Sequence, residues 1–260
     1  MNSNNINVIK IGGSTIDDWD KTLDQINELI DMGQSLIIVH GGGKTLSDWS
    51  SKLGIRPEFV RGLRKTDGNT LEVAIAILSG LVNNKLVSFL NQKKIKSVGI
   101  SGLSGNMILA EVSNKDLGFV GEIKVLNTEL IENLLNNNFV PVISPIGINQ
   151  NPDHLNESIL NINADFVASA IATSLKASRL IYQTDVEGIK DEKGRVIPKM
   201  TLSQAKNLIN SGIVVGGMVP KLQSCIDSMQ GVDHSHIISG SESSLIDLIK
   251  GKRIGTEIIN

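Results

Sequence analysis

Along this chain, short unbroken runs of apolar residues alternate with segments in which apolar residues recur every three or four positions. The first run, residues 8–11, contains one cation, Lys10, and is followed at once by two glycines. A second run, residues 35–40, also ends in glycines. Apolar runs bounded by glycine are typical of buried strands in a parallel sheet, and the wider spacing is typical of helices that cover one. The pattern therefore predicts an α/β fold.

The same two patterns continue to the end of the chain. Further strands are predicted over residues 97–101, 107–112, 119–125, 139–144, 179–183, 236–239 and 256–259. Helices are predicted over residues 15–31, 70–90, 129–135, 166–175 and 205–209, and from a glycine-rich turn at 212–217 to about residue 230. Residues 56–67 have no clean period, which predicts a loop or short hairpin. No linker separates two halves, so two lobes, if present, are expected to share one sheet.

Composition limits the kind of partner that the chain can have. The chain has 260 residues, of which 40% are hydrophobic, and this suffices for a full-sized core. Its formal net charge of -2 gives no basic surface for nucleic acid or membrane. A small-molecule ligand is therefore expected. The single cysteine, Cys225, forms neither an internal disulfide nor a Cys/His metal cluster. No signal-peptide pattern and no apolar run of roughly 18 residues is found, so a cytoplasmic location is expected.

Lys10 stands at the carboxyl end of the first predicted strand, where parallel sheets bind ligands. Gly12 and Gly13 follow it and lack the Cβ atoms that would keep a phosphate away from backbone N–H groups. With a predicted helix after them, this turn has the features of an anion cradle at a helix start. The alternative is an ordinary strand-to-helix turn beside a lysine whose aliphatic stem is buried.

The second glycine turn, Gly41 to Gly43, is followed by Lys44 and Thr45, as in a P-loop. A P-loop also needs a glycine five residues before its last one, and that position holds Ile38 inside a predicted strand. The P-loop interpretation therefore fails. Two glycine turns on adjacent parallel strands can still face one bound anion.

Three further residues place charge where a ligand could meet it. Arg64 follows a glycine and suits bidentate capture of a carboxylate, although a solvated surface arginine is the more common interpretation. Asp165 follows Asn163, which is a good N-cap for a helix. Asp165 has a role beyond the start of this helix only if cations lie near it. Lys221 stands beside a glycine-rich turn, as Lys10 does.

Taken together, these motifs resemble those of the amino acid kinase family. They are Lys10-Ile11-Gly12-Gly13, His40-Gly41-Gly42-Gly43, Gly62-Leu63-Arg64, Asp116-Leu117-Gly118-Phe119-Val120-Gly121, Asn161-Ile162-Asn163-Ala164-Asp165, Thr184-Asp185-Val186-Glu187-Gly188 and Gly217-Met218-Val219-Pro220-Lys221. The resemblance covers nearly the whole chain in the family's order. It implies a three-layer α-β-α sandwich around a mainly parallel central sheet. It also implies an N-terminal lobe, 1–175, for the acyl amino acid and dimerisation, and a C-terminal lobe, 176–260, for ATP.

The resemblance further implies a reaction. That reaction is the ATP-dependent phosphorylation of the side-chain carboxylate of N-acetyl-L-glutamate to N-acetyl-L-glutamyl 5-phosphate, a step of arginine biosynthesis, with Mg²⁺ on the phosphates of the nucleotide. A carboxylate with a pKa of about 4.3 is ionised at neutral pH, so this nucleophile needs no general base. The protein must instead neutralise negative charge while the carboxylate and the phosphates of the nucleotide approach each other.

By the same resemblance, particular residues acquire roles. Lys10 and Lys221 would be the transition-state cations, with Asp165 orienting both. Backbone amides of Gly12, Gly13, Gly42 and Gly43 would hold the phosphoryl group and the substrate, Arg64 would bind a substrate carboxylate, and Asn161 would hydrogen-bond the α-substituents. The nucleotide would lie over Asp185, Val186, Glu187, Gly188, Ile189 and Lys190 and over Ile213, Val214 and Val215. No metal-ligating side chains are expected.

Two segments depart from the family pattern. The family often has Ser-Gly-Lys-Asp-Gly where this chain has Ser101-Gly102-Leu103-Ser104-Gly105, and residues 239–244 also differ. The helix predicted over 70–90 carries few charges, which favours burial against a second subunit. Only nine residues precede Lys10, so the N-terminal helix that links arginine-inhibited relatives into hexamers is expected to be absent. We therefore expect a homodimer that arginine does not inhibit.

Three other functions compete with this one. A related kinase acts on aminoadipate or glutamate attached to an amino-group carrier protein; residues 101–103 suit that branch, but its members generally lack the motifs at 116–121 and 161–165. A non-catalytic ligand sensor is also open, because fold does not fix function, but it would not need both lysines and Asp165. A dehydrogenase is disfavoured, because Gly99, Gly102 and Gly105 lack the G-x-G-x-x-G spacing.

Overall fold

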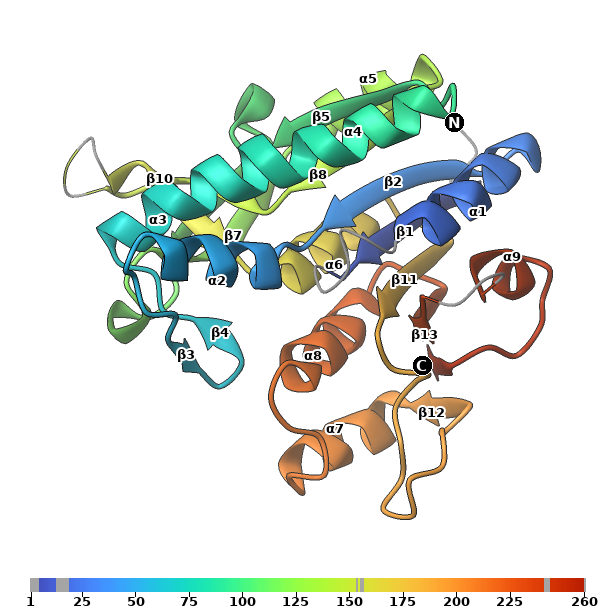
Figure 1. Cartoon of the computed structure of the whole chain (residues 1–260). Coiled ribbons are helices and arrows are strands. Elements are labelled where there is room, and N and C mark those ends of the chain that lie inside the picture. Colours follow the sequence, from blue (N-terminus) through green and yellow to red (C-terminus); the bar gives the residue numbers. More distant parts are fainter. Residues whose placement is uncertain (1–4, 13–18, 153, 155–156, 241–243, 260) are drawn as a thin grey trace.

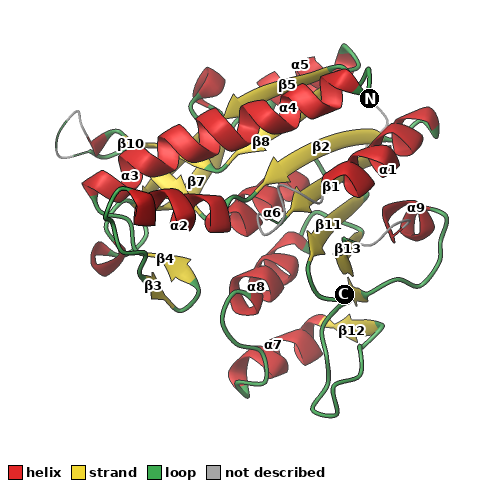
Figure 2. Ribbon diagram, viewed as in Figure 1, coloured by secondary structure: helices red, strands yellow, loops and turns green. Residues whose placement is uncertain are grey.

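One eight-stranded sheet forms the centre of the molecule. The structure is a computed structural model that describes residues 5–12, 19–152, 154, 157–240 and 244–259. The strands run in the order β12-β14-β13-β11-β1-β2-β8-β5, with helices on both faces (Figures 1 and 2). They are β1 (Ile6–Ile11), β2 (Ser35–His40), β5 (Ser97–Ser101), β8 (Val140–Ser144), β11 (Arg179–Thr184), β12 (Lys199–Thr201), β13 (His234–Ser239) and β14 (Thr256–Ile259). Every neighbouring pair is parallel except β13 with β14, which confirms the predicted sandwich.

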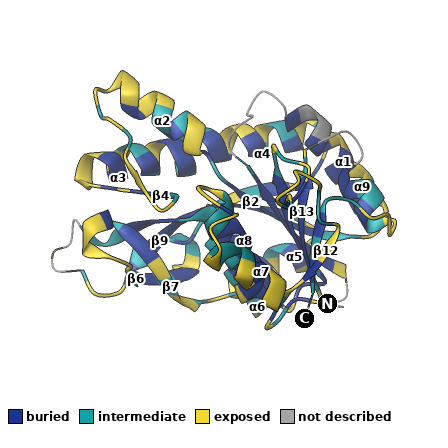
Figure 3. Cartoon of the chain, turned by 90° about the horizontal axis from the view of Figure 1, so that it is seen from below, coloured by how far each residue is buried: buried dark blue, intermediate teal, exposed yellow. Residues whose placement is uncertain are grey.

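Alternation along β1 decides which way Lys10 points. Val8 belongs to one hydrophobic core and Ile9 to the other, because successive strand residues face opposite sides of a sheet. Lys10 is two residues from Val8 and so lies on the same face as Val8. The inner strands of the sheet, between the two helical layers, are almost entirely buried, whereas the edge strands β5 and β12 are more exposed (Figure 3).

Each core has its own set of helices. The core that contains Val8 is covered by α5 (Glu129–Asn136), α6 (Ala164–Ser174), α7 (Leu202–Asn210) and α8 (Met218–Ser228). The core that contains Ile9 is covered by α1 (Trp19–Asp31), α2 (Gly43–Lys52), the helical stretch from residue 68 to 92 and α9 (Ser244–Ile249). Lys10 therefore faces α6 and α8.

A small closed barrel stands beside the large sheet. Its strands are β6 (Ile108–Val112), β7 (Val120–Leu126), β9 (Ile146–Asn149) and β10 (Ile159–Ile162), in the order β10-β7-β6-β9. The sequence predicted β6 and β7, but it treated the segment before Asp165 as a helix entry and missed β9 and β10. Residues 56–67 do form a short hairpin, β3 (Phe59–Val60) and β4 (Leu63–Arg64), as predicted.

The helix predicted over 70–90 is present and longer. It runs as α3 (Gly68–Ala74), a π-helical segment (Ile75–Val82) and α4 (Asn83–Gln92). Within the described part of the chain it is the one helix long and apolar enough to cross a membrane by length and composition. Core helices of soluble proteins also meet that test, and Leu78, Leu86 and Leu90 of this helix are buried in the core.

Several boundaries differ from the prediction. Strand β12 and helix α9 were not predicted, and the helix predicted from residue 15 is described from Trp19 onward. Residues 13–18 and 241–243 lie outside the described residues, so the predicted glycine turn at Gly13 does too. The sheet takes four strands from residues 1–175 and four from residues 176–260. The division into two functional lobes stays a prediction.

Candidate active site

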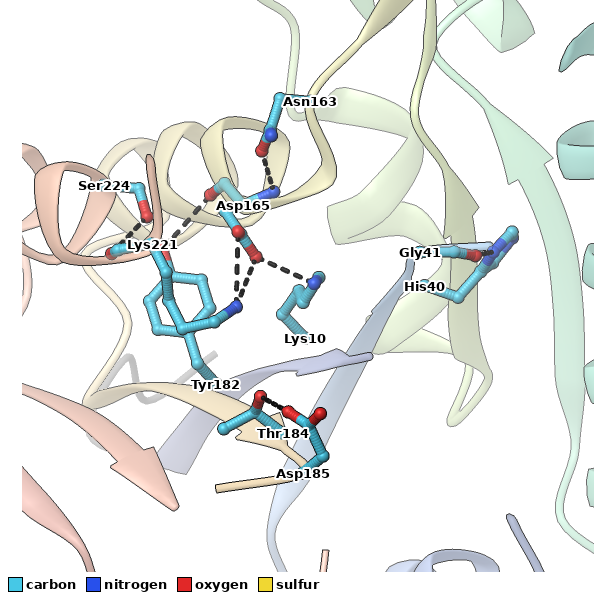
Figure 4. Close-up of polar contacts among 10 residues, drawn as sticks. All are labelled: Lys10, His40, Gly41, Asn163, Asp165, Tyr182, Thr184, Asp185, Lys221 and Ser224. Carbon is cyan, nitrogen blue, oxygen red and sulfur yellow. Dashed lines mark hydrogen bonds and ion pairs between the residues drawn. The ribbon is translucent and has the colours of Figure 1, made fainter. Parts of the chain in front are cut away.

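Lys10, Asp165 and Lys221 meet in the interior of the protein. The Lys10 ammonium lies 2.9 Å from Asp165 Oδ1, and the Lys221 ammonium lies 3.1 Å from Oδ1 and 3.3 Å from Oδ2 (Figure 4). Their exposed fractions are 8%, 5% and 6% in the order Lys10, Asp165, Lys221. Two lysines 211 positions apart in the sequence therefore share one carboxylate, and the group as a whole carries one net positive charge.

Three separate elements bring these side chains together. Lys10 is on β1, Asp165 is in the first turn of α6, and Lys221 is in the first turn of α8. Asn163 caps α6, since its side chain accepts a hydrogen bond of 2.8 Å from the Asp165 amide. The capping role and the pairing role therefore coexist, with the Asp165 carboxylate left free to bind the two lysines.

Tyr182 supports this cluster from the neighbouring strand. It sits beside Lys10 in the register of β11 with β1, and its hydroxyl donates to the Asp165 carbonyl oxygen at 3.1 Å. The Lys221 ammonium lies 5.2 Å from the centroid of the Tyr182 ring, a cation–π distance. Burial raises the pKa of the Tyr182 phenol well above its ordinary value, so it stays a neutral donor. The sequence analysis missed Tyr182, because its pairing with Lys10 depends on the register of two strands that are distant in the sequence.

The charges of the cluster oppose the effect of burial. Burial raises the pKa of the Asp165 carboxyl, but the charges of Lys10 and Lys221 outweigh it, so this pKa lies below its ordinary value. Burial also lowers the pKa of the Lys10 ammonium, and Lys221 lowers it further against the attraction of Asp165. The carboxylate is therefore ionised at neutral pH.

A cavity of about 560 Å³ opens onto this cluster. Its wall includes residues from every motif that the sequence singled out for the substrate, and two of the residues predicted to lie under the nucleotide. The lining residues that the sequence predicted are Lys10, Gly12, Gly42, Gly43, Arg64, Asn161, Asp165, Asp185, Val186 and Lys221. Thr184, Gly217, Met218 and Pro220 also line it, although no role was predicted for them. One cavity thus joins the candidate phosphotransfer and substrate groups.

The two glycine turns differ in what they offer. The Gly12 amide already donates to the Gln183 carbonyl at 3.1 Å, so it serves the sheet and is not a free anion donor in this structure. Gly42 and Gly43 instead stand at the start of α2, where the N-cap residue Gly42 has no side chain that could accept hydrogen bonds from the first N–H groups of the helix. The first N–H groups of a helix lack partners within it and attract anions. A Cβ at Gly42 would lie 2.5 Å from Leu78 Cδ2, so a larger residue here requires the Leu78 side chain to move.

His40, which precedes this turn, is structural. Its Nδ1 lies 2.7 Å from the Gly41 carbonyl and its Nε2 lies 3.1 Å from the Asn83 side-chain amide. The Gly41 carbonyl can only accept and the amide can donate, so Nδ1 carries the proton. Burial lowers the pKa of His40 to about 4, which keeps the ring neutral. His40 therefore fixes the turn and does not face the cavity.

Arg64 is a buried guanidinium with one unused side. Its Nη2 donates to the Gly43 carbonyl at 2.9 Å and to Ser47 Oγ at 2.7 Å, and its Cζ lies 4.7 Å from the centroid of the Phe59 ring. Its Nη1 is buried and has no hydrogen-bond partner among the described residues. Burial lowers the pKa of the guanidinium, but arginine stays charged at neutral pH. The interpretation as a solvated surface arginine is wrong, and the free Nη1 is suited to a carboxylate.

Asn161 is held by the motif at residues 116–121. Its side-chain amide donates to Thr66 Oγ1 at 3.2 Å, and its backbone N–H donates to the Phe119 carbonyl at 3.0 Å. Thr66 in turn pairs with Leu117 and Phe119 through backbone hydrogen bonds of 2.8 and 2.7 Å. A Cβ at Gly118 would lie 2.3 Å from the Thr66 carbonyl oxygen, so only glycine fits there. The motif therefore supports the cavity wall through Thr66, which the sequence analysis did not single out.

The predicted nucleotide residues divide into two groups. Asp185 and Val186 line the cavity, and Asp185 accepts a hydrogen bond from Thr184 Oγ1 at 2.9 Å. Glu187 and Lys190 are exposed on the same loop and pair with each other at 3.9 Å, and Val215 is exposed farther along the chain. Gly188, Ile189 and Val214 are buried, and the Ile189 and Val214 side chains belong to the core. Ile213 is exposed and, like Val215, is not part of the cavity wall.

Two buried ammonium groups beside a helix N-terminus form a site for polyanions, and enzymes that transfer phosphoryl groups depend on such electrostatic clamps. Residues 5–239 match the amino acid kinase family, and the chain belongs to that family.

Particular relatives cover almost the whole chain. An acetylglutamate kinase of Dehalococcoides mccartyi is 40% identical over 247 residues, which cover 95% of this chain and 91% of that protein. An acetylglutamate kinase of Syntrophomonas wolfei is 39% identical over 264 residues, covering 97% of this chain and 90% of that protein. Among solved structures, smu.665 of Streptococcus mutans UA159 is similar with a TM-score of 0.84 at 29% identity, covering 98% of this chain and 99% of that one.

Proposed function

We propose that this protein transfers the γ-phosphoryl group of ATP to the side-chain carboxylate of N-acetyl-L-glutamate, which is a step of arginine biosynthesis. The observation that carries the proposal is the pair of buried ammonium groups, Lys10 and Lys221, on one carboxylate in the cavity that also holds Arg64. Relatives at about 40% identity over nearly their full length are acetylglutamate kinases, which supports the choice of acceptor.

The reaction forms a bond between the acceptor carboxylate oxygen and the γ-phosphorus and breaks the bond between that phosphorus and the oxygen of the departing ADP. The carboxylate is already ionised, so no side chain has to remove a proton from it. Its approach to the triphosphate is opposed by charge repulsion, which Lys10 and Lys221 offset. Asp165 holds both ammonium groups in place, so little reorganisation is needed as charge develops.

The acceptor is held from the opposite side of the cavity. In this proposal Arg64 Nη1 binds a carboxylate of the acyl amino acid, and the N-terminal amides of α2 at Gly42 and Gly43 meet the reacting carboxylate. Asn161, fixed by Thr66, hydrogen-bonds the α-substituents. The guanidinium is preorganised by Gly43, Ser47 and Phe59, so its planar fork loses little freedom on binding.

The nucleotide occupies the side of the cavity formed by Thr184, Asp185, Val186 and Lys221. Mg²⁺ is expected on the nucleotide phosphates, where it neutralises phosphate charge. The described cavity wall has two carboxylates, Asp165 and Asp185. Asp165 is already paired with both lysines, so its oxygens are not available to a metal ion. The side chains therefore leave the ion to the phosphates, with Asp185 as the carboxylate able to approach it.

A hydroxylamine trapping assay tests the proposal. The enzyme is incubated with ATP, Mg²⁺ and hydroxylamine, and acyl phosphate is measured as hydroxamate with N-acetyl-L-glutamate, glutamate, aminoadipate and aspartate in turn. We expect the highest kcat/KM with N-acetyl-L-glutamate and no product without ATP. Product only with glutamate or aminoadipate attached to an amino-group carrier protein would favour the competing kinase branch and reject this acceptor.

We also propose that the protein works as a homodimer in the cytoplasm. The helix from residue 68 to 92 leaves Ile75, Leu81 and Val87 partly exposed, and β5 beside it is an edge strand of the sheet. Both features favour contact with a second copy. The free thiol of Cys225 is buried, which is consistent with a reducing compartment.

A further inference from the structure

Two histidines and one glutamate gather on the sheet among the strands of the C-terminal half. His234 and His236 are two residues apart on β13 and so point to the same face. Glu257 on β14 is the cross-strand partner of His236. One nitrogen from each ring and one carboxylate oxygen all lie within 4.8 Å of one another. The sequence analysis predicted no metal-ligating cluster, because it searched for cysteines and did not consider this strand pair.

These residues line a pocket of their own. Its volume is about 360 Å³, and none of its described lining residues also lines the active-site cavity. The pocket lies over four adjacent strands of the sheet, on which Arg179 pairs with His234, His236 with Glu257, and Glu257 with Lys199. It is therefore separate from the phosphotransfer site.

His236, which lines this pocket, has an unexplained polar atom. The residue is 6% exposed, and its Nδ1 is buried without a hydrogen-bond partner among the described residues. Buried polar atoms of native proteins are almost always satisfied, so such an atom needs an explanation. His234 stacks on His236 with ring centroids 6.0 Å apart, and its Nδ1 lies 2.8 Å from Glu257 Oε1. Three potential ligands thus point into one small volume.

We propose that His234, His236 and Glu257 bind a first-row divalent transition-metal ion of the zinc type. Two imidazoles and one carboxylate are ligands that such an ion prefers, and three protein ligands leave one tetrahedral position for water. Ligand atoms on a tetrahedral zinc ion are roughly 3.3 Å apart, so the three groups need to close by at most roughly 1.5 Å. The ion would join β13 to β14, the antiparallel pair of the sheet.

The charged groups around the cluster affect how strongly it can bind a metal ion. Lys199 Nζ lies 3.3 Å from Glu257 Oε2 and competes with the ion for this carboxylate. The Lys199 side chain is 56% exposed, so it can turn into solvent when the ion binds. Arg179 faces Asp233 as well as Glu257, Lys252 pairs with Asp247 at 2.9 Å, and Arg253 completes the basic side of the pocket. Lys199 is therefore the cation whose removal should strengthen metal binding.

Cobalt titration tests the proposal directly. The full chain is treated with a chelator, dialysed and titrated with Co²⁺ without nucleotide, and the visible absorption of the bound ion is recorded, followed by displacement with Zn²⁺. We expect one Co²⁺ per chain, a band typical of nitrogen and oxygen ligands, and complete displacement by Zn²⁺. Zn²⁺ should also raise the thermal unfolding midpoint, and a chelator should reverse the rise. Absence of a saturable band at one ion per chain would overturn the proposal.

Variants locate the ion. His234→Asn, whose side chain is 44% exposed in the wild type, should fold and should lower Co²⁺ affinity by at least the roughly 10- to 100-fold that loss of a supporting partner costs. Glu257→Gln should lower it similarly. His154→Asn, at an exposed histidine outside the cluster, should leave it unchanged. Equal affinity in His234→Asn and wild type would assign the ion elsewhere and reject the site.

Lys199→Met separates a metal site from an anion pocket. If the pocket binds a metal, loss of this competing cation raises Co²⁺ affinity several-fold. If the basic side chains instead form an anion site, the variant leaves Co²⁺ affinity unchanged or lowers it, and that result would overturn the proposal.

Discussion

At the scale of single residues, the centre of the site buries more positive than negative charge. A buried ion pair contributes little to stability, because the cost of removing charges from water offsets most of their attraction. Here two ammonium groups share one carboxylate, so one positive charge remains unmatched. A fold has no reason to bury such a charge for its own stability. The excess is best explained by an anionic ligand that completes the balance.

The lysine pair could be predicted from the sequence, but its surroundings could not. Lys10, Asp165 and Lys221 follow from the resemblance to the family, and strand alternation gives the direction of Lys10. Tyr182 and Thr66 carry no local signal, because each acts through a contact with a residue that is distant in the sequence. The Gly12 amide was predicted to hold an anion, yet the register of β1 with β11 occupies it.

Replacing Arg64 by lysine separates acceptor binding from catalysis. A lysine keeps the charge but cannot contact Gly43, Ser47 and an acceptor carboxylate together, nor stack on Phe59 in the same way. We expect Arg64→Lys to raise KM for N-acetyl-L-glutamate by roughly 10- to 100-fold, the equivalent of one charged hydrogen bond, with KM for ATP unchanged. Steady-state kinetics with each substrate varied gives both values.

The matched control for this variant is Lys65→Ala. The Lys65 side chain is next to Arg64 in the sequence but is 50% exposed, and it pairs with Glu58 at 3.5 Å. It should leave both KM values unchanged. A rise in KM for ATP alone in Arg64→Lys would contradict the placement of the acceptor.

The lowered pKa of Lys10 predicts how activity depends on pH. Burial disfavours the ammonium form, so Lys10 loses its proton at a lower pH than an ordinary lysine with a pKa of about 10.4. As pH rises, kcat should therefore fall with an apparent pKa below that value. In Lys10→Arg, whose guanidinium stays charged, this fall should be absent from the remaining activity. A kcat that stays constant up to the pH of unfolding in the wild type would contradict this role.

At the scale of elements, the segment at residues 117–119 works as a clamp on the cavity wall. It pairs with Thr66 on one side and with Asn161 on the other, and Gly118 makes the close approach possible. The sequence analysis found the motif but placed it in a turn between strands. Its contact with Thr66 depends on tertiary structure, because about fifty residues separate the two segments.

Gly118→Ala tests this clamp. The glycine has φ 71° and ψ -132°, and an added Cβ would lie 2.3 Å from the Thr66 carbonyl oxygen. Gly194→Ala is the control, because Gly194 has φ 75° with nothing within 4 Å of the added atom. We expect Gly194→Ala to lower the free energy of unfolding by about 1–2 kcal/mol through backbone strain alone. Gly118→Ala should cost about 1–3 kcal/mol more and raise KM for the acceptor.

Equal effects of the two glycine variants in chemical denaturation would show that the close contact with Thr66 does not matter. If Gly118→Ala is destabilised but has a normal KM for the acceptor, the contact of residues 117–119 with Thr66 does not contribute to acceptor binding.

Elements with a strong apolar pattern were predicted well, and several short ones were missed. The strand over residues 35–40 and the helix over residues 129–135 have strong apolar patterns and are present with nearly the predicted bounds. The strands β9, β10 and β12 have three or four residues each, too few for a period to appear. The barrel also depends on pairing between distant segments, which one sequence cannot reveal.

At the scale of the whole molecule, the sheet joins the two halves of the chain. The neighbours β1 and β11 come from opposite halves, and Lys10 and Lys221 approach Asp165 because α6 and α8 cover the same face. The halves therefore cannot separate without breaking the site. The absence of a linker predicted that two lobes, if present, would share one sheet, and the resemblance to the family predicted that Asp165 lies between Lys10 and Lys221.

The proposed homodimer is tested by mass in solution. Light scattering coupled to size-exclusion chromatography should give twice the chain mass of 28.0 kDa across working concentrations. Charged residues at Leu81 and Val87, in the variant Leu81→Glu with Val87→Lys, should shift the protein toward the monomer if this helix forms the interface. A wild-type monomer at all concentrations would contradict the dimer, and so would a hexamer.

The central claim is that two buried ammonium groups act on one phosphoryl group, and turnover of lysine variants tests it most directly. With saturating ATP and N-acetyl-L-glutamate, kcat should fall about 10²- to 10³-fold in Lys10→Ala and in Lys221→Ala, as when other electrostatic clamps lose one group. Lys250→Ala, which removes an exposed pair with Glu28, should keep wild-type turnover. Near-normal turnover in a folded Lys10→Ala or Lys221→Ala would contradict the account.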